Sequence, residues 1–274
     1  ILPVALHRML VLNGKKDLLL VVQYYLSLCV LILICCVLPA GMSRAAWIAS
    51  LVSCGYVVLR LYREKIKSFV LRHRYALLGV LIVGTLFATG MYFIKRDSVD
   101  GRLLIWKITT QAIADSPWGV EGGKTFSAFY GDVQERYFTD CKYSDSEAWV
   151  AGTPDFAFNE YLQIAVEYGV WGSVLFVTVL LMLLKIAGNC KHLAGMGGCL
   201  VSLMVFACFS YPIHIPAIVS IWSLVVIVLC GEGLVMMKYR LIPKIVLLSV
   251  VASGLIVSIK IHDWYSIRTQ AVRE

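Results

Sequence analysis

Polar residues that border long apolar segments are the first candidates for chemistry in this chain. Arg44 stands in Met42-Ser43-Arg44-Ala45-Ala46, directly after one apolar run and before another. An arginine at the mouth of a membrane span is costly unless its head group snorkels to water or binds an anion. The sequence leaves both interpretations open.

A second group lies between residues 101 and 123. Apolar Ile105, Ile108 and Ala112 recur at helical spacing, which predicts a helix lying on or dipping into the membrane interface. Arg102 and Trp106 are one turn apart on this helix. The Pro117-Trp118-Gly119-Val120-Glu121-Gly122-Gly123 stretch that follows predicts a tight loop with accessible backbone amides.

A third group is the run from Phe158 to Gly169. At 100° per residue, its polar side chains fall within an arc of about 100°. They are Asn159, Glu160, Gln163 and Glu167. The stripe is either a solvated face at the lipid head groups or part of a site. Glu167, its deepest member, lies near the hydrocarbon boundary, where a carboxylate is costly.

These candidates must be positioned by membrane helices. Hydrophobic residues make up 59% of the chain, charged residues 15%, and the mean hydropathy is +0.79. Apolar runs of about 20 residues are long enough to cross a bilayer as helices. Helices are suited to lipid because they satisfy their backbone hydrogen bonds internally. Seven spans are predicted, at about 18–40, 45–60, 75–94, 168–187, 197–212, 214–231 and 243–261.

Two of these spans nearly touch at Tyr211-Pro212-Ile213-His214-Ile215-Pro216. Two prolines break a helix there, so the pair forms either a helical hairpin or one kinked element. The turn carries His214, which is a further candidate for the site.

The distribution of charge predicts the orientation in the membrane. Six basic residues and one acidic residue lie between 60 and 74, which places that loop in the cytoplasm by the positive-inside rule. The long polar segment 95–160 then lies outside, with eleven acidic and seven basic residues. The net charge of +8 is therefore a topology signal, and no basic patch with interleaved aromatics predicts a nucleic-acid partner.

The predicted organisation has three parts: transmembrane helices in 1–94, the outer loop 95–160, and transmembrane helices with a short outer tail in 161–274. The chain opens on Ile1 and reads as a piece of a longer polytopic protein. Eight of nine cysteines lie in or beside spans, and only Cys141 lies in the outer loop. This spacing predicts neither a disulfide nor a metal site.

Several short motifs follow one another along about residues 20–232. They are Ser43-Arg44-Ala45, Arg102 with Ile105-Trp106, Pro117 with Gly119, Asn159-Glu160-Tyr161-Leu162, and Glu167 with Gly169. In order and spacing, this set resembles the O-antigen ligase/polymerase superfamily of bacterial membrane proteins.

The resemblance implies an all-α, GT-C-like bundle in the bacterial inner membrane with its active face outside the cytoplasm. It implies transfer of an undecaprenyl-diphosphate-linked glycan to a lipid or glycan acceptor, without a cofactor or metal. Arg44 and Arg102 match the arginines that hold the diphosphate in the ligases. The substrate-binding set then comprises Arg44, Arg102, Trp106, Asn159, Tyr161, Gln163 and His214.

The general base departs from the family pattern. A histidine usually stands before the asparagine, and here Phe158 replaces it, which fits a polymerase or a divergent branch better than a ligase. The base is then predicted to be Glu160 or Glu167. Glu160 is preferred because it lies two residues after Phe158 at the outer end of the stripe, where an acceptor sugar arriving from water could reach it. His214 is the alternative.

Two other classes of function remain open. A polysaccharide flippase or another transporter would fit many spans, although transporters usually show repeated halves and polar residues at mid-membrane. A non-catalytic membrane scaffold would fit the missing histidine. The concentration of polar residues in 95–160 favours surface chemistry over both.

Overall fold

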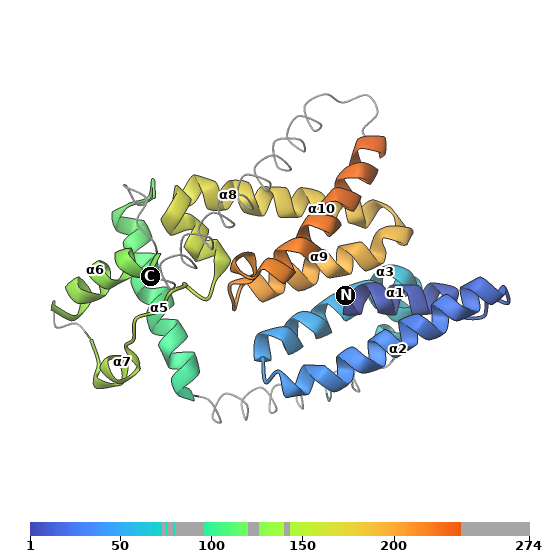
Figure 1. The fold of residues 1–274 in the computed structure, drawn as a ribbon, viewed down its shortest axis with the longest axis horizontal. Coiled ribbons are helices and arrows are strands. Elements are labelled where there is room, and N and C mark those ends of the chain that lie inside the picture. The colour runs from blue at the N-terminus through green and yellow to red at the C-terminus, as the bar shows by residue number, and fades with distance from the viewer. Residues whose placement is uncertain (73–74, 76–78, 80–95, 120–125, 140–142, 237–274) are drawn as a thin grey trace, which may run out of the picture. The chain divides into compact units, whose positions relative to one another are not determined.

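The computed structural model describes the whole chain except residues 73–74, 76–78, 80–95, 120–125, 140–142 and 237–274. All regular elements in the described part are helices (Figure 1). The α-helices are α1 (Leu2–Leu12), α2 (Leu18–Ala40), α3 (Arg44–Arg72), α5 (Arg96–Asp115), α6 (Phe126–Thr139), α7 (Asp145–Val150), α8 (Glu160–Asn189), α9 (Ala194–Ala207) and α10 (Pro216–Met236). Two short 3-10 helices, η1 (Lys191–Leu193) and η2 (Pro212–His214), flank α9.

Four helical segments are long and apolar enough to cross a membrane: Leu18–Ala40, Arg44–Phe69, Glu160–Asn189 and Pro216–Gly233. They confirm four of the predicted spans. The predicted spans at 75–94 and 243–261 fall outside the described residues. The span predicted at 197–212 corresponds to α9, whose 14 residues rise only about 21 Å, less than the roughly 30 Å hydrocarbon core.

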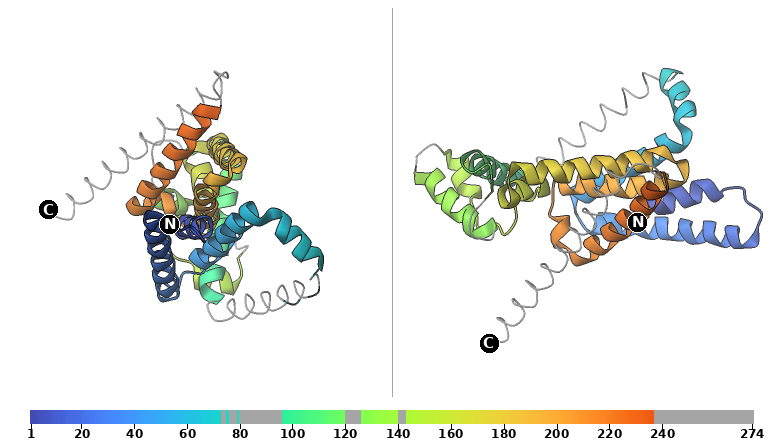
Figure 2. Two further views of the ribbon diagram at one scale, coloured as in Figure 1. Left: turned by 90° about the vertical axis from the view of Figure 1, so that its right-hand side faces the viewer. Right: turned by 90° about the horizontal axis from the view of Figure 1, so that it is seen from above.

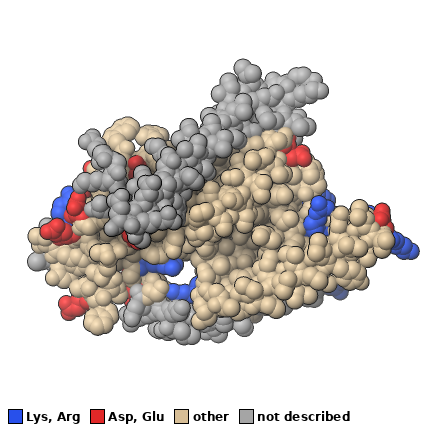
Figure 3. Space-filling view, viewed as in Figure 1, with Lys and Arg blue, Asp and Glu red and all other residues tan. Residues whose placement is uncertain are grey.

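The surface of α2 shows why a membrane is needed. None of its residues is buried, and its mean hydropathy is 2.6. Large apolar side chains such as Leu18, Leu33 and Val37 are exposed. A space-filling view shows broad surfaces without charge over the long helices (Figure 3). Such surfaces are stable where lipid replaces water as the solvent.

The described helices belong to two compact units. Among the described residues, the first comprises 1–60, 178–206 and 212–236. In it, α1 runs alongside α2 (Figure 2). Glycines let α9 approach its neighbours closely: a Cβ at Gly198 would lie 2.6 Å from Val57 of α3 and 2.8 Å from Pro3 of α1. Small residues at such contacts are typical of helix packing in membranes.

The second unit comprises residues 61–177 and 207–211. Its core is a cluster of buried side chains from α5, α6 and the segment after α7. The members are Leu104, Ile108, Ala112, Phe126, Tyr130, Val133, Tyr137 and Ala157. Residues 95–160, predicted as a loop with one interfacial helix, therefore contain three packed helices. The predicted helix at 101–112 is confirmed as part of α5. Its apolar face packs against α6, and the position of this helix on or in the outer membrane interface stays a prediction.

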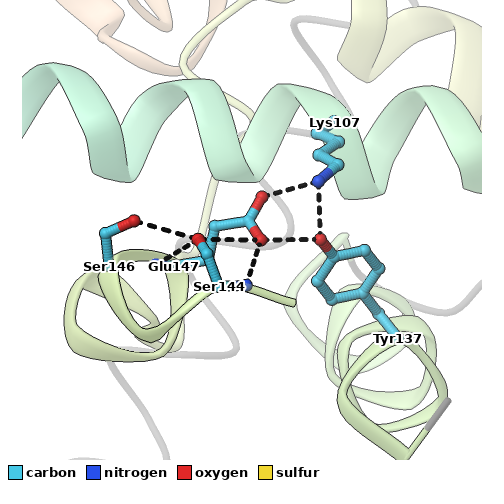
Figure 4. Close-up of polar contacts among 5 residues, drawn as sticks. All are labelled: Lys107, Tyr137, Ser144, Ser146 and Glu147. Atoms are coloured by element: carbon cyan, nitrogen blue, oxygen red, sulfur yellow. Dashed lines mark hydrogen bonds and ion pairs between the residues drawn. The ribbon is translucent and has the colours of Figure 1, made fainter. Parts of the chain in front are cut away.

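A polar brace joins α5, α6 and α7 (Figure 4). Lys107 Nζ lies 2.6 Å from Glu147 Oε1 and donates to Tyr137 Oη at 2.7 Å, and Tyr137 Oη donates to Glu147 Oε2 at 3.0 Å. Glu147 also completes a capping box with Ser144 at the start of α7. The hydrogen bond from Lys107, followed by the backbone bond from Ser144, lowers the pKa of Glu147 to about 2.

Helix α8 turns sharply at Gly169, where φ is 77° and ψ is 171°. The Ser173 hydroxyl donates to the carbonyl of Tyr161 at 3.0 Å. Twelve residues of straight helix span about 18 Å, so this bond requires the two parts of α8 to fold toward each other. The polar stripe lies on the first part, and the apolar span is the second.

Candidate functional site

The site lies in the second unit, where α5 and the start of α8 meet the segment that joins α7 to α8. Asn159 sets the beginning of α8. Its Oδ1 accepts hydrogen bonds from the backbone amides of Tyr161 at 3.0 Å and Leu162 at 3.2 Å. These bonds satisfy amides that have no partner inside the helix. Asn159, predicted as a substrate ligand, therefore has a structural role as the N-cap.

A chain of hydrogen bonds then runs from α5 to the polar stripe. Trp106 Nε1 donates to the carbonyl of Ala157 at 3.0 Å, and the Ala157 amide donates to Gln163 Oε1 at 3.1 Å. Gln163 Nε2 donates to Glu167 Oε1 at 3.0 Å. The prediction that Gln163 and Glu167 share one face is confirmed. This series of hydrogen bonds links Glu167 Oε1 to α5 through Gln163 and Ala157.

Arg102 is held one turn before Trp106. Its Nη1 donates to the carbonyl of Phe209 at 2.9 Å. Its guanidinium carbon lies 5.0 Å from the ring centroid of Phe158, within the range of a cation–π interaction. Both contacts restrict a long, flexible side chain. Arg102 therefore presents a fixed charge beside the segment that carries the carboxylates.

Phe158 itself occupies an unusual backbone conformation. Its φ is +52°, a region that is uncommon for residues other than glycine. Its ring contacts Tyr211 edge-on, with centroids 5.5 Å apart, and Phe156 stacks on the same tyrosine at 4.5 Å. Observed strain of this kind persists where the surroundings enforce it, and it clusters at functional sites. Phe158 thus sits between Tyr211 and Arg102 and restricts the arginine side chain.

The two carboxylates differ in exposure. Glu160 retains only 1% of its accessible surface, and Gln163 beside it is also buried. Glu167 is half-buried. The prediction that an acceptor sugar could reach Glu160 directly from water was therefore wrong.

The second unit thus brings together seven of the predicted residues: Arg102, Trp106, Asn159, Glu160, Tyr161, Gln163 and Glu167. Arg44 and His214 belong to the first unit. Arg44 begins α3, whose N-terminus is capped by Ser43, since Ser43 Oγ accepts from the Ala46 amide at 3.3 Å. His214 ends η2. The convergence of Arg44 with Arg102 stays a prediction.

Three contributors were missed from the sequence. Ala157 and Phe209 act through backbone atoms, which leave no signal in residue type. Tyr211 was noted only as part of the prolyl turn, although it contacts both Phe156 and Phe158.

Together, the helical fold and the long apolar segments define an integral membrane protein. The model of the O-antigen ligase family matches residues 29–177, which is more than half of the chain. The chain belongs to this family, and the resemblance read from the short motifs is confirmed. The matched region contains Arg44, Arg102 and both carboxylates, whereas Phe209, Tyr211 and His214 lie beyond it.

A curated relative from Rickettsia bellii (strain RML369-C) bears the name "putative polysaccharide ligase". It is 27% identical over 178 residues, which cover 63% of this chain and 40% of the relative. The chain thus spans about two fifths of the length of the curated relative that it matches. No solved structure matches the chain.

Proposed function

We propose that this protein is a glycan ligase or polymerase that uses a lipid diphosphate-linked donor. Membership of the O-antigen ligase family points to transfer between glycans in a membrane. The proposed donor is an undecaprenyl-diphosphate-linked glycan, and the proposed acceptor is a sugar hydroxyl on a lipid or glycan. The proposed site faces the extracytoplasmic side of a bacterial inner membrane.

One observation carries the proposal: Arg102 and the hydrogen-bonded Gln163–Glu167 pair are both tied to α5. Arg102 lies on α5, and Trp106 one turn later is linked to the pair through Ala157. The cation is held by the Phe209 carbonyl and the Phe158 ring. The carboxylate is tied to the same helix through Trp106 and Ala157. Departure of the diphosphate requires a positive charge, which Arg102 would supply. Attack by the acceptor hydroxyl requires a base, which the carboxylate would supply.

The reaction divides between these groups. The bond from the anomeric carbon of the donor sugar to the diphosphate oxygen breaks, and the lipid diphosphate leaves with the electron pair. The acceptor oxygen bonds to the anomeric carbon and loses its proton to a base. Arginine stabilises the departing charge through bidentate contacts, and Arg44 is proposed as the second arginine. Trp106, Tyr161 and His214 complete the proposed substrate contacts.

The base is proposed to be a carboxylate, and the structure revises the order of preference. Glu160 is buried and Glu167 is half-buried. A general base must come within hydrogen-bond reach of the hydroxyl, which favours Glu167 for direct contact with an acceptor. Glu160 is then proposed to set the field around the site from within the protein.

The test is transfer by purified protein from a lipid diphosphate-linked oligosaccharide to an acceptor. Arg102→Lys should lower the rate nearly as much as Arg102→Ala, because lysine loses the planar fork. Arg136→Lys is the matched control, since Arg136 lies on α6 and is exposed. A fully active Arg102→Lys variant would remove bidentate diphosphate binding from the proposal.

The same assay identifies the base. Glu160→Gln, Glu167→Gln and His214→Ala are compared at equal amounts of folded protein. Loss of a general base should lower the rate by about 10²–10⁴-fold, and we expect the largest loss for Glu167→Gln. If only His214→Ala is inactive, the carboxylate assignment is wrong. If no variant transfers less than the parent, the reaction uses no protein base.

The length of the product separates the two reaction types. A polymerase extends a lipid-linked chain by repeat units, whereas a ligase moves a finished chain to another acceptor. Phe158 in place of the histidine favours polymerisation, so we expect products that remain on the lipid carrier and grow with time.

A further inference from the structure

We propose that Trp118, Tyr168 and Trp171 form an anchor in the lipid head-group region, and that a contact between two glycines holds the anchor rigid. The partner of this surface is the bilayer interface. The inference rests on the geometry of the turn in α8 and does not depend on the proposed transfer reaction.

The glycine contact joins the end of the α5 segment to the turn of α8. A Cβ at Gly119 would lie 2.8 Å from the Gly169 nitrogen, and a Cβ at Gly169 would lie 2.7 Å from the carbonyl carbon of Trp118. Both glycines have positive φ, +97° and +77°. The Val170 amide donates to the Pro117 carbonyl at 2.9 Å. Backbone meets backbone here, so Trp118 is fixed beside the turn.

The aromatic side chains at this junction point away from the protein. Trp118 is 80% exposed, Tyr168 61% and Trp171 67%. Three large exposed rings on a rigid junction are costly in water. Tryptophan and tyrosine are enriched where membrane meets water, because an apolar ring body and a polar edge match that boundary.

The length of the remaining helix places the boundary at the same point. From Val170 to Asn189, α8 has 20 residues, which rise about 30 Å and match the hydrocarbon core. Exposed Val174, Leu175 and Leu181 follow the junction along this part. The aromatic cluster therefore stands at one end of a span of full length.

The anchor has a consequence for the site. The glycine contact links the segment directly after α5 to the membrane-boundary end of α8, and Arg102 lies on α5. This consequence, unlike the anchor itself, rests on the proposed function: a lipid diphosphate lies at the membrane surface, so an anchored end of α5 keeps Arg102 at a fixed depth relative to that group.

The test measures the depth of individual tryptophans in the purified protein in lipid nanodiscs. Trp118→Phe and Trp171→Phe are each compared with the parent protein, and the lost fluorescence is that of the removed residue. Quenchers are lipids brominated near the head group, lipids brominated near the chain end, and aqueous iodide. Trp149→Phe is the matched control, because Trp149 is as exposed as Trp118 but lies beside Asp145 and Glu147 on α7.

We expect the lost fluorescence of Trp118 and Trp171 to be quenched most by the shallow brominated lipid and protected from iodide. The lost fluorescence of Trp149 should be quenched by iodide. Quenching of Trp118 by iodide alone overturns the anchor, and so does stronger quenching by the deep brominated lipid. Equal quenching of Trp149 and Trp118 by the brominated lipids also overturns the anchor, because Trp118 would then be no nearer to lipid than a tryptophan on α7. Transfer activity is no readout here, so the proposed function and the anchor can fail separately.

Discussion

Replacement of Gly169 by alanine should destabilise the second unit strongly, because two independent penalties fall on one methyl group. The backbone at Gly169, with φ 77° and ψ 171°, lies in a region that only glycine occupies readily. The added Cβ would also lie 2.7 Å from both the carbonyl carbon and the oxygen of Trp118. These neighbours are backbone atoms, which cannot rotate aside.

The magnitude follows from the two penalties. A strained backbone of this kind costs about 1–3 kcal/mol, and overpacking at a rigid contact costs about 1–3 kcal/mol. The loss in free energy of unfolding is then about 2–6 kcal/mol, at the upper end of single substitutions. Gly188→Ala is the control in the same helix, because nothing lies within 4 Å of its added Cβ. There we expect no loss, since alanine favours helix over glycine.

Two measurements in detergent micelles check this prediction. Pulse proteolysis across a denaturant series gives the free energy of unfolding for both variants. Hydrogen exchange at the Val170 amide, which donates to the Pro117 carbonyl, reports the local junction and should accelerate in Gly169→Ala. If Gly169→Ala is as stable as Gly188→Ala and protects this amide equally, the described glycine contact does not exist in the protein.

Three further predictions concern charge, the aromatic support and orientation. Glu147→Gln should cost at most about 1 kcal/mol in stability near neutral pH, because the lysine partner is 53% exposed. Because folding lowers the pKa of Glu147 from 4.5 to about 2, the stability that its charge contributes is complete above about pH 4.5 and is lost as the pH falls through about 2. A difference in stability between parent and Glu147→Gln that grows in acid would contradict this prediction. Phe158→Ala should slow transfer by about 2–30-fold through loss of about 0.5–2 kcal/mol of cation–π interaction with Arg102, whereas Phe158→Tyr should retain the rate; equal rates in both variants would exclude this role. A cysteine at Ser127 should react with an impermeant thiol reagent added outside intact cells, and one at Ser68 should not; the opposite labelling would invert the topology.

Apolar continuity and helical periodicity were readable from the sequence. The runs at 18–40, 45–60, 168–187 and 214–231 became helices long enough to span a membrane, because a chain in lipid must satisfy its backbone internally. The period of Ile105, Ile108 and Ala112 predicted a helix, and α5 contains it. These are local properties, since a residue and its neighbours up to one or two turns away determine them.

What each helical face contacts was decided only by the tertiary structure. The apolar face of α5 was compatible with lipid or with another helix, and α6 covers it. Glu160 lies at the outer end of a polar stripe in the sequence, yet its side chain is buried in the folded chain. Periodicity specifies that a face is apolar or polar and carries no information about the partner on that face.

The site shows the same division between residue type and position. The resemblance implied anion binding for Arg102, and the chemistry of a carboxylate made Glu160 and Glu167 candidates for the base, with Glu160 preferred. Their fixation depends on partners far away in sequence: Arg102 donates to Phe209, which lies 107 residues on, and Gly119 touches Gly169 across 50 residues. Residue chemistry is local and can be read in one dimension, whereas these contacts arise from the path of the backbone, which is settled only when all helices pack together.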